Sequence, residues 1–251
     1  MDEAGAATVT PRRPPHRRYP WLVSGGLLLI LVFLAINVLA DGPMIAADRS
    51  IRAWVQIQAN SHTWKWLKVG PWSPARVLVV LGNVRVAFPV LAIIVIMAAI
   101  RARSPRPLLT AAVGVALLLG TVLPAKILFA RPDPGRSNLG GHILGAFPSG
   151  HTSTACVCYF LAVLLVSPHP PARARRIGLA IAGVLPFLVG MALIWCDLHW
   201  FTDVAAAWAL SPLLIMLAVR LTRRRKPRTA ASVPERRIET PAPPWAAARL
   251  R

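Results

Sequence analysis

Charged side chains are scarce in this chain, and acidic ones most of all. Only 15% of its 251 residues are Asp, Glu, Lys or Arg, and only nine residues are acidic. A soluble domain normally carries about 25% charged residues, so the shortage argues against a soluble globular protein. Apolar residues fill the chain instead: 55% are hydrophobic, and the mean hydropathy is +0.55. The composition therefore favours an integral membrane protein.

Cysteine is also rare, which limits its chemistry here. Cys156 and Cys158 form a C-x-C pair inside an apolar run, and Cys196 lies in a later one. No His or Cys partner stands at the spacing of a zinc site. We expect these cysteines to be small packing residues.

Basic residues are the abundant charged type, and they give a net charge of +20. Such a charge first suggests nucleic-acid binding, but no basic face is interleaved with aromatic residues. The basic clusters instead flank the apolar part of the chain, where they act as topology signals and contacts for anionic lipid head groups. They are Arg12, Arg13, Arg17 and Arg18 before it, and Arg223, Arg224, Arg225, Lys226 and Arg228 after it.

Six apolar runs predict an all-α, six-helix membrane bundle. Five of them have about the length that a membrane helix requires, roughly 20 residues, and the fourth is somewhat short. The first run could instead be a cleaved signal peptide, but the apolar core of such a peptide is about 7–15 residues, so we expect a retained span. The runs are Trp21–Ala40, a span within Val77–Ile100, Pro107–Phe129, Thr152–Val166, Ile177–Cys196 and Val204–Leu221.

The chain divides into four parts by composition. Residues 1–20 and 222–251 are rich in proline and arginine, and we expect both to be disordered and basic. Residues 21–76 hold the first span and a loop whose tryptophans predict a surface-lying helix. Residues 77–221 form the transmembrane core.

The positive-inside rule orients these spans. Both termini and the basic loops 101–106 and 173–176 fall on one side, which we expect to be the cytoplasm. The other side then receives 41–76, 126–151 and 197–203. These outer segments hold His142, His151, His199, Asp133, Asp197 and Asp203, so the chemistry should gather at one membrane face.

Three outer segments carry groups suited to phosphate. Lys126 and Arg131 end the third span, and their cations fit phosphate oxygens. Ser149 and Gly150 precede the fourth run, where the backbone N–H groups of a helix start can bind an anion. Ser149 adds a hydroxyl, and glycine permits close approach of a ligand.

Two histidines supply the chemistry that phosphoryl transfer to water needs, a nucleophile and an acid. They are His151 and His199. Asp203 follows His199 by four residues, one helical turn, so its carboxylate can hold one ring nitrogen protonated and leave the other free to attack. Asp197 is a further candidate for the site, or else the partner of a nearby arginine.

These motifs resemble the type 2 phosphatidic acid phosphatase family, membrane lipid phosphatases that share a core with vanadium haloperoxidases. The family pattern is K-x6-RP, then PSGH, then SR-x5-H-x3-D. PSGH at 148–151 matches in full, and HWFTD at 199–203 matches the His-x3-Asp end. The resemblance covers about 80–221.

The resemblance implies a role for each matched residue. His199 is the nucleophile that forms a phosphohistidine, Asp203 orients it, and His151 protonates the leaving lipid oxygen. The phosphate is bound by Lys126, Arg131, Ser149 and the amide of Gly150. No metal or other cofactor is implied.

Two positions depart from the family pattern, and both should hold a phosphate-binding arginine. Asp133 stands at the first and Leu193 at the second. Arg131, Arg136 or Arg85 could replace them. For Arg85, snorkelling to the membrane interface is the simpler explanation.

The sequence thus predicts a membrane phosphatase acting on a lipid phosphate at the extracytoplasmic face. The substrate classes left open are a polyprenyl mono- or pyrophosphate, a phosphatidylglycerol phosphate and phosphatidic acid. The alternative is a degenerate member that binds or moves lipid phosphates without hydrolysis, and a haloperoxidase is a remote third. The alanine-, arginine- and proline-rich composition suggests a bacterium, hence a plasma membrane.

Overall fold

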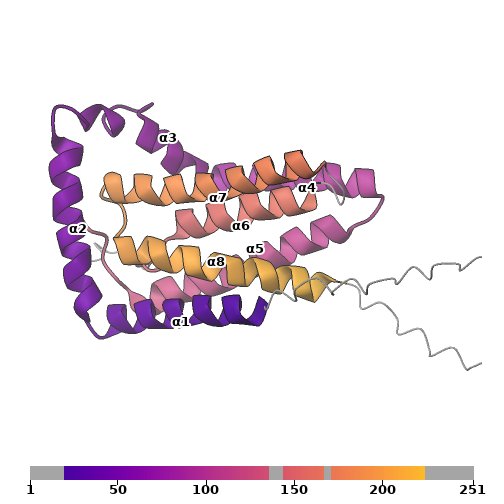
Figure 1. Ribbon diagram of the computed structural model, residues 1–251, viewed down its shortest axis with the longest axis horizontal. Helices are drawn as coiled ribbons and strands as arrows, with labels where there is room; N and C mark the ends of the chain where they lie inside the picture. Colours follow the sequence, from indigo (N-terminus) through magenta and orange to yellow (C-terminus); the bar gives the residue numbers. More distant parts are fainter. Residues whose placement is uncertain (1–19, 136–143, 167–170, 224–251) are drawn as a thin grey trace, which may run out of the picture.

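The computed structural model describes residues 20–135, 144–166 and 171–223, and these form helices without a strand (Figure 1). Arg136, His142 and most of the two basic termini lie outside the described residues. The helices are α1 Pro20–Leu39, α2 Pro43–Asn60, the 3-10 turn η1 Lys65–Leu67, α3 Pro74–Leu81, α4 Val84–Ala102, α5 Arg106–Phe129, α6 Gly150–Leu165, α7 Ala172–Trp195 and α8 Phe201–Thr222.

Five of these helices, α1, α4, α5, α7 and α8, are long and apolar enough to cross a membrane, and α6 is a shorter apolar helix. Together they account for the six predicted spans. The second span begins later than the sequence suggested, because the chain breaks between α3 and α4 at Gly82 and Asn83. The side chain of Asn83 caps α4 by accepting a hydrogen bond from the N–H of Arg85 at 2.9 Å.

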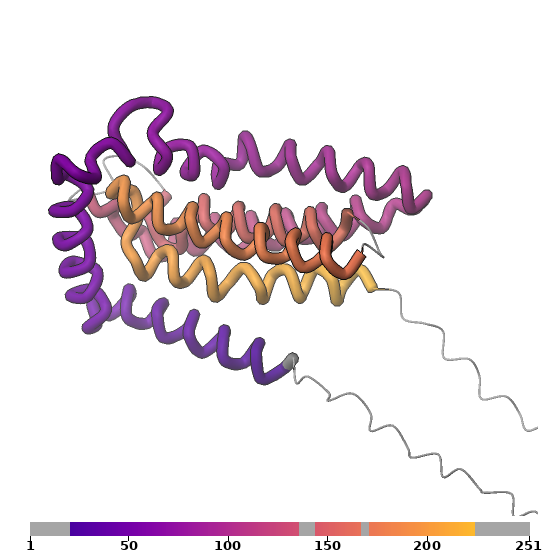
Figure 2. Tube along the Cα trace, turned by 45° about the horizontal axis from the view of Figure 1, so that its top comes forward, coloured from indigo at the N-terminus to yellow at the C-terminus, as the bar shows by residue number. Residues whose placement is uncertain are grey.

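The shortest membrane helix, α6, lies at the centre of the bundle (Figure 2). It packs against α4, α5, α7 and α8, while α1 packs outside α8. Burial on all sides explains why the first part of α6, from Thr152 to Cys158, is buried without interruption. The small side chains of this stretch let the neighbouring helices approach closely. The N-terminus of α6 therefore opens inside the bundle rather than on its outer surface.

Helix α2 runs across one end of the bundle, transverse to the membrane helices (Figures 1 and 2). Its inner face buries Asp48, Val55 and Ala59, while Trp54 and Ile57 are exposed. This amphipathic helix occupies the segment for which the sequence predicted a surface-lying helix. It covers the end at which α5 and α7 finish and α6 and α8 begin.

The opposite end of the bundle is basic. The start of α1, the end of α8, the turn between α4 and α5, and the facing ends of α6 and α7 all lie there (Figure 1). The described arginines of this end are Arg101, Arg103, Arg106, Arg173, Arg175, Arg176, Arg220 and Arg223. The positive-inside rule assigns such a basic end to the cytoplasm, so an extracytoplasmic position of α2 stays a prediction.

Candidate functional site

His199, two residues before α8 begins at Phe201, is held by a buried carboxylate in the first turn of that helix. Nδ1 of His199 lies 3.3 Å from Oδ2 of Asp203, and the N–H of Trp200 donates to the same oxygen at 3.0 Å. Asp203 is fully buried, and His199 is 9% exposed. The carboxylate therefore fixes the ring and favours a proton on Nδ1. Nε2, the nitrogen turned away from the carboxylate, is left as the reactive one.

The N-terminus of α6 lies against this turn. Ser149 is the N-cap of α6, and its Oγ accepts a hydrogen bond from the N–H of Thr152 at 3.4 Å. The N–H of Ser149 in turn donates to the backbone oxygen of Asp203 at 3.0 Å. With Ser149 capping the helix, the N–H groups of Gly150 and His151 stand at its open end, where an anion is favoured by the helix dipole.

Lys126, near the end of α5, reaches the same place. Its Nζ donates to the backbone oxygens of Gly145 at 2.6 Å and Ala146 at 3.4 Å. Its Cε lies 3.4 Å from the point where Gly150 would carry a Cβ, so the lysine chain passes directly over the start of α6. Lys126 is also within electrostatic range of Asp203. The ammonium thus stands beside the α6 amides, as a phosphate site requires.

His151, the second residue of α6, completes the group. It lies within electrostatic range of both His199 and Lys126. Nδ2 of Asn83, at the break between α3 and α4, lies 3.5 Å from its Nε2. The structure therefore brings together Lys126, His151 and His199, which are separated by up to 73 positions in the sequence (199 − 126).

Arg131 points into the protein rather than toward this group. Its guanidinium donates to Oδ1 of Asp203 at 2.6 Å and to Oγ1 of Thr202 at 2.6 Å through NH1, and to Oδ2 of Asp48 at 2.7 Å through NH2. Its side chain is 8% exposed and stacks over the ring of Trp200. Two carboxylates and a hydroxyl thus accept three of the five N–H donors that the sequence offered to phosphate.

Asp48 is the residue that sequence reasoning missed. It is 1% exposed, and it accepts hydrogen bonds from the N–H and the hydroxyl of Thr202 besides that of Arg131. One signal was present: Asp48, Val55 and Ala59 follow the spacing of one helical face, so a carboxylate stands on the apolar side of an amphipathic helix. Buried carboxylates are paired, so this placement indicated a buried basic partner.

The remaining candidates lie around the site. Asp197 forms a bidentate pair with Arg52 of α2, at 2.7 and 2.8 Å, so the expectation of a nearby arginine is confirmed. Arg85 is exposed in the first turn of α4, two residues after Asn83. Leu193 is buried in an apolar cluster with Ala155 and Val189, so α7 contributes no charge at that position.

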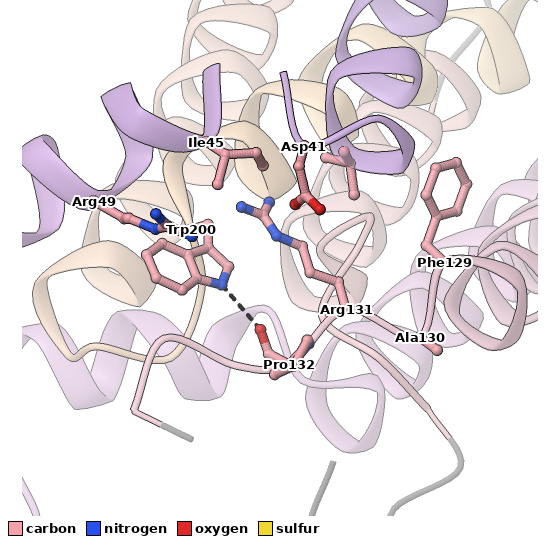
Figure 3. Close-up of a pocket in the computed structure, with 9 residues that line it drawn as sticks. Asp41, Ile45, Arg49, Phe129, Ala130, Arg131, Pro132 and Trp200 are labelled. Carbon is pink, nitrogen blue, oxygen red and sulfur yellow. Dashed lines mark hydrogen bonds between the residues drawn. The ribbon is translucent and has the colours of Figure 1, made fainter. Parts of the chain in front are cut away.

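A pocket of about 330 Å³ opens on the far side of Arg131 (Figure 3). It lies between the end of α1, the start of α2 and the segment after α5, where Trp200 Nε1 donates to the backbone oxygen of Pro132 at 2.9 Å. Arg131 and Trp200 line it, and Asp41 and Arg49 face it from the other wall.

The described residues contain no group of three or more His, Cys, Asp and Glu side chains placed to hold a metal ion. The site contains the ammonium group of Lys126, the N-terminus of α6, and the imidazoles of His151 and His199. The ring of His199 is also in contact with the carboxylate of Asp203. This set can bind a tetrahedral anion, attack it, and protonate the group that leaves.

Comparison with known proteins gives one family. Residues 107–227 match the model of the PAP2 superfamily. Phosphatidylglycerophosphatase B of Bacillus subtilis (strain 168) is 36% identical over 103 residues, which make up 40% of this chain and 49% of the relative. The match thus spans about half the length of that curated relative.

A solved structure extends the likeness to nearly the whole described fold. The first transmembrane PAP2 type phosphatidylglycerolphosphate phosphatase from Bacillus subtilis matches with a TM-score of 0.67 at 22% identity. The match covers 82% of this chain and 98% of that one. The all-helical membrane architecture is therefore shared.

Proposed function

Because residues 107–227 belong to the PAP2 superfamily, we propose that this protein is a membrane phosphatase that removes phosphate from a lipid at the extracytoplasmic face. The observation that carries the proposal is the meeting of Lys126, the α6 N-terminus, His151 and the His199–Asp203 pair at one end of the bundle. A lipid whose tail lies in the bilayer would present its phosphate at this level.

The chemistry runs in two steps. Nε2 of His199 attacks the phosphorus, the bond from phosphorus to the lipid oxygen breaks, and His151 donates a proton to that oxygen. His151 then takes a proton from water, whose oxygen attacks the phosphohistidine. The bond from phosphorus to nitrogen breaks, phosphate leaves, and His199 is restored. Asp203 stabilises the charged ring in between, since its carboxylate faces Nδ1.

Fewer cationic side chains are available to bind the phosphate than in the family pattern. Asp133 and Leu193 replace two arginines, and the donors of Arg131 are directed to Asp48, Asp203 and Thr202. We assign the phosphate to Lys126 and to the N–H groups of Gly150 and His151, with Ser149 holding the helix start. The other version of this proposal is that Arg131, Arg85 or Arg136 contacts the phosphate directly. No step requires a metal.

The lipid substrates that fit this site differ in their head groups. The two Bacillus subtilis relatives are named for phosphatidylglycerophosphate, so a phosphatidylglycerol phosphate is the substrate that we place first. Polyprenyl mono- or pyrophosphates and phosphatidic acid are the other candidates. All of these lipids have an apolar tail and a terminal phosphate, and they differ in the chemical group to which that phosphate is attached.

The shortage of phosphate-binding arginines favours a second candidate, a protein that binds or moves lipid phosphates without hydrolysis. The two candidates differ in phosphate release by purified protein from each of these lipids, with His199→Ala as the control. We expect wild type to release phosphate from at least one lipid and His199→Ala to lose nearly all of the activity. Binding with equal, background release from both proteins would establish the second candidate.

A further inference from the structure

Helix α2 is linked to the first turn of α8 by ion pairs with a shared arginine. Asp48 and Asp203 come from different ends of the chain, and both bind the guanidinium of Arg131, at 2.7 and 2.6 Å. Asp203 gives Oδ1 to Arg131 and Oδ2 to His199. The atoms thus form one continuous series, from the carboxylate of Asp48 through Arg131 and Asp203 to the ring of His199.

The charges of this series have a consequence for His199. Arg131 alone would neutralise Asp203 and weaken its hold on a positively charged imidazole. With Asp48 present, one cation stands between two carboxylates, and one net negative charge remains beside His199. Because all three groups are almost fully removed from water, these charges are weakly screened.

We propose that Asp48 is a positioning residue that acts through Arg131, restoring the negative charge behind His199 and so setting the pH range in which His199 is active. The proposal rests on the function assigned to His199 above. Asp48 touches neither the phosphate nor the reacting nitrogen. Its two further donors, the N–H and hydroxyl of Thr202, fix the carboxylate on α8 one residue before Asp203.

Other charged groups also surround His199 and must be held constant in a test. It contacts Asp203 of α8, and it interacts electrostatically with His151 of α6. Lys126 of α5 lies within range of both of those residues. Asp197, two residues earlier, is paired with Arg52. Asp133 interacts electrostatically with Lys126 and belongs to the same surroundings.

The test is a charge cycle with three variants, Asp48→Asn, Arg131→Gln and the double variant, read from the pH profile of kcat/KM. Asp48→Asn removes a negative charge, which makes the protonated ring less stable, so the acidic limb should move to lower pH by about half to one unit. Arg131→Gln removes the cation and should move the limb to higher pH by a similar amount. The double variant should return it to near the wild-type position.

The matched control is Val55→Ala, which removes buried apolar contacts of α2 with Ile194 and Val204 and changes no charge. It should lower the melting temperature and leave the acidic limb in place. An equal shift in Val55→Ala and Asp48→Asn would mean that Asp48 only holds α2 down, and would overturn the proposal. A folded Asp48→Asn with the wild-type limb would overturn it as well.

A second readout does not depend on turnover. Diethyl pyrocarbonate modifies only unprotonated imidazole, so its rate at His199, measured by peptide mass spectrometry against pH, should shift in the same directions. Exposed His62 serves as the internal reference. Wild type inactive on every lipid phosphate would reject the proposed function, while an unshifted modification profile in Asp48→Asn would reject this inference alone.

The test can still be carried out if one of the two single variants fails to fold. Asp48→Asn leaves Arg131 opposite one carboxylate and Arg131→Gln leaves two carboxylates facing each other, whereas the double variant has uncharged side chains of similar shape at both positions and keeps the single negative charge of Asp203. Replacement of a whole buried ion pair is tolerated better than removal of one partner, so the double variant should fold. A folded double variant whose limb stays at the Arg131→Gln position would contradict the proposal.

Discussion

The backbone N–H of Ser149 donates a hydrogen bond to the backbone oxygen of Asp203 at 3.0 Å. This bond joins the start of the helix that presents amides to a phosphate with the turn that holds His199. Ser149 is also the cap of α6, and Asp203 is also the partner of His199. The anion site and the nucleophile therefore form a single unit, and α6, at the centre of the bundle, supports both.

Replacing His151 should have an effect that depends on the leaving group. If His151 protonates the departing lipid oxygen, His151→Ala should lower kcat on a lipid phosphate by about 10²–10⁴-fold. A nitrophenyl phosphate ester, whose leaving group needs no proton, should lose far less. Steady-state kinetics on both substrates measure the difference. An equal loss on both would assign His151 to phosphate binding or to structure.

We expect Lys126 to have two roles. Its positive charge should help to bind the phosphate, and its hydrogen bonds should stabilise the fold. Lys126→Gln keeps a donor for the carbonyls of Gly145 and Ala146 but removes the cation, so kcat/KM should fall by about 10–100-fold. Lys126→Met removes both and should also lower the melting temperature. Exposed Lys65 provides the control, since Lys65→Gln should leave both quantities unchanged. Wild-type kcat/KM in Lys126→Gln would remove Lys126 from the site.

Gly145 holds the segment before α6 against the segment after α5. A Cβ there would lie 2.5 Å from the backbone N of Arg131 and 2.9 Å from the backbone carbon of Ala130, and neither can move aside cheaply. Gly145→Ala should therefore destabilise the protein by about 1–3 kcal/mol and lower activity.

Gly120, inside α5, is the matched comparison for that variant because no atom lies within 4 Å of its Cβ position. Gly120→Ala should keep or slightly raise the melting temperature, since alanine is the better helix former. Thermal unfolding in detergent compares the two proteins. A Gly145→Ala protein as stable and as active as Gly120→Ala would contradict the close approach seen in the structure.

Cys196 reports which side of the membrane holds the site. Cys156 and Cys158 are buried, whereas Cys196 is partly exposed in a pocket of about 400 Å³ lined also by Arg76 and Leu198. Burial raises the pKa of the Cys196 thiol, although the charges of Arg76 and Lys68 oppose this rise. Its reactive thiolate is therefore scarce at neutral pH and increases as the pH is raised.

An impermeant maleimide added to intact cells should label Cys196 at a rate that rises with pH. The permeant maleimide serves as the reference, and Cys196→Ser should abolish the signal. Labelling by the permeant reagent alone would place this end of the bundle in the cytoplasm and reverse the predicted orientation.

Hydropathy and short motifs were enough to predict the membrane helices and the three segments of the site. Each span is a run of contiguous residues, and His199 and Asp203 lie four residues apart at the start of α8, so their contact is local in sequence. The break between α3 and α4 was missed because Gly82 and Asn83 interrupt an otherwise apolar stretch without a charge. The side chain of Asn83 caps the start of α4 there, and hydropathy does not register such a cap.

The direction of Arg131 could not be predicted from its neighbours in the chain. The sequence shows an arginine close to Lys126, which suits phosphate, but the two carboxylates that bind it are 83 and 72 positions away. Asp48 comes from a segment that hydropathy assigns only to a loop. The arrangement depends on how α2 folds back over the bundle, which is a tertiary feature.

The most direct measurement is the site of covalent phosphate during turnover. Purified protein is mixed with a ³²P-labelled lipid phosphate, quenched in base within milliseconds, and digested for mapping by mass spectrometry. The account predicts an acid-labile, base-stable phosphate on His199, absent from His199→Ala and reduced in Asp203→Asn. Steady phosphate release with no phosphohistidine, or with the label on His151, would contradict the assignment of His199 as the nucleophile.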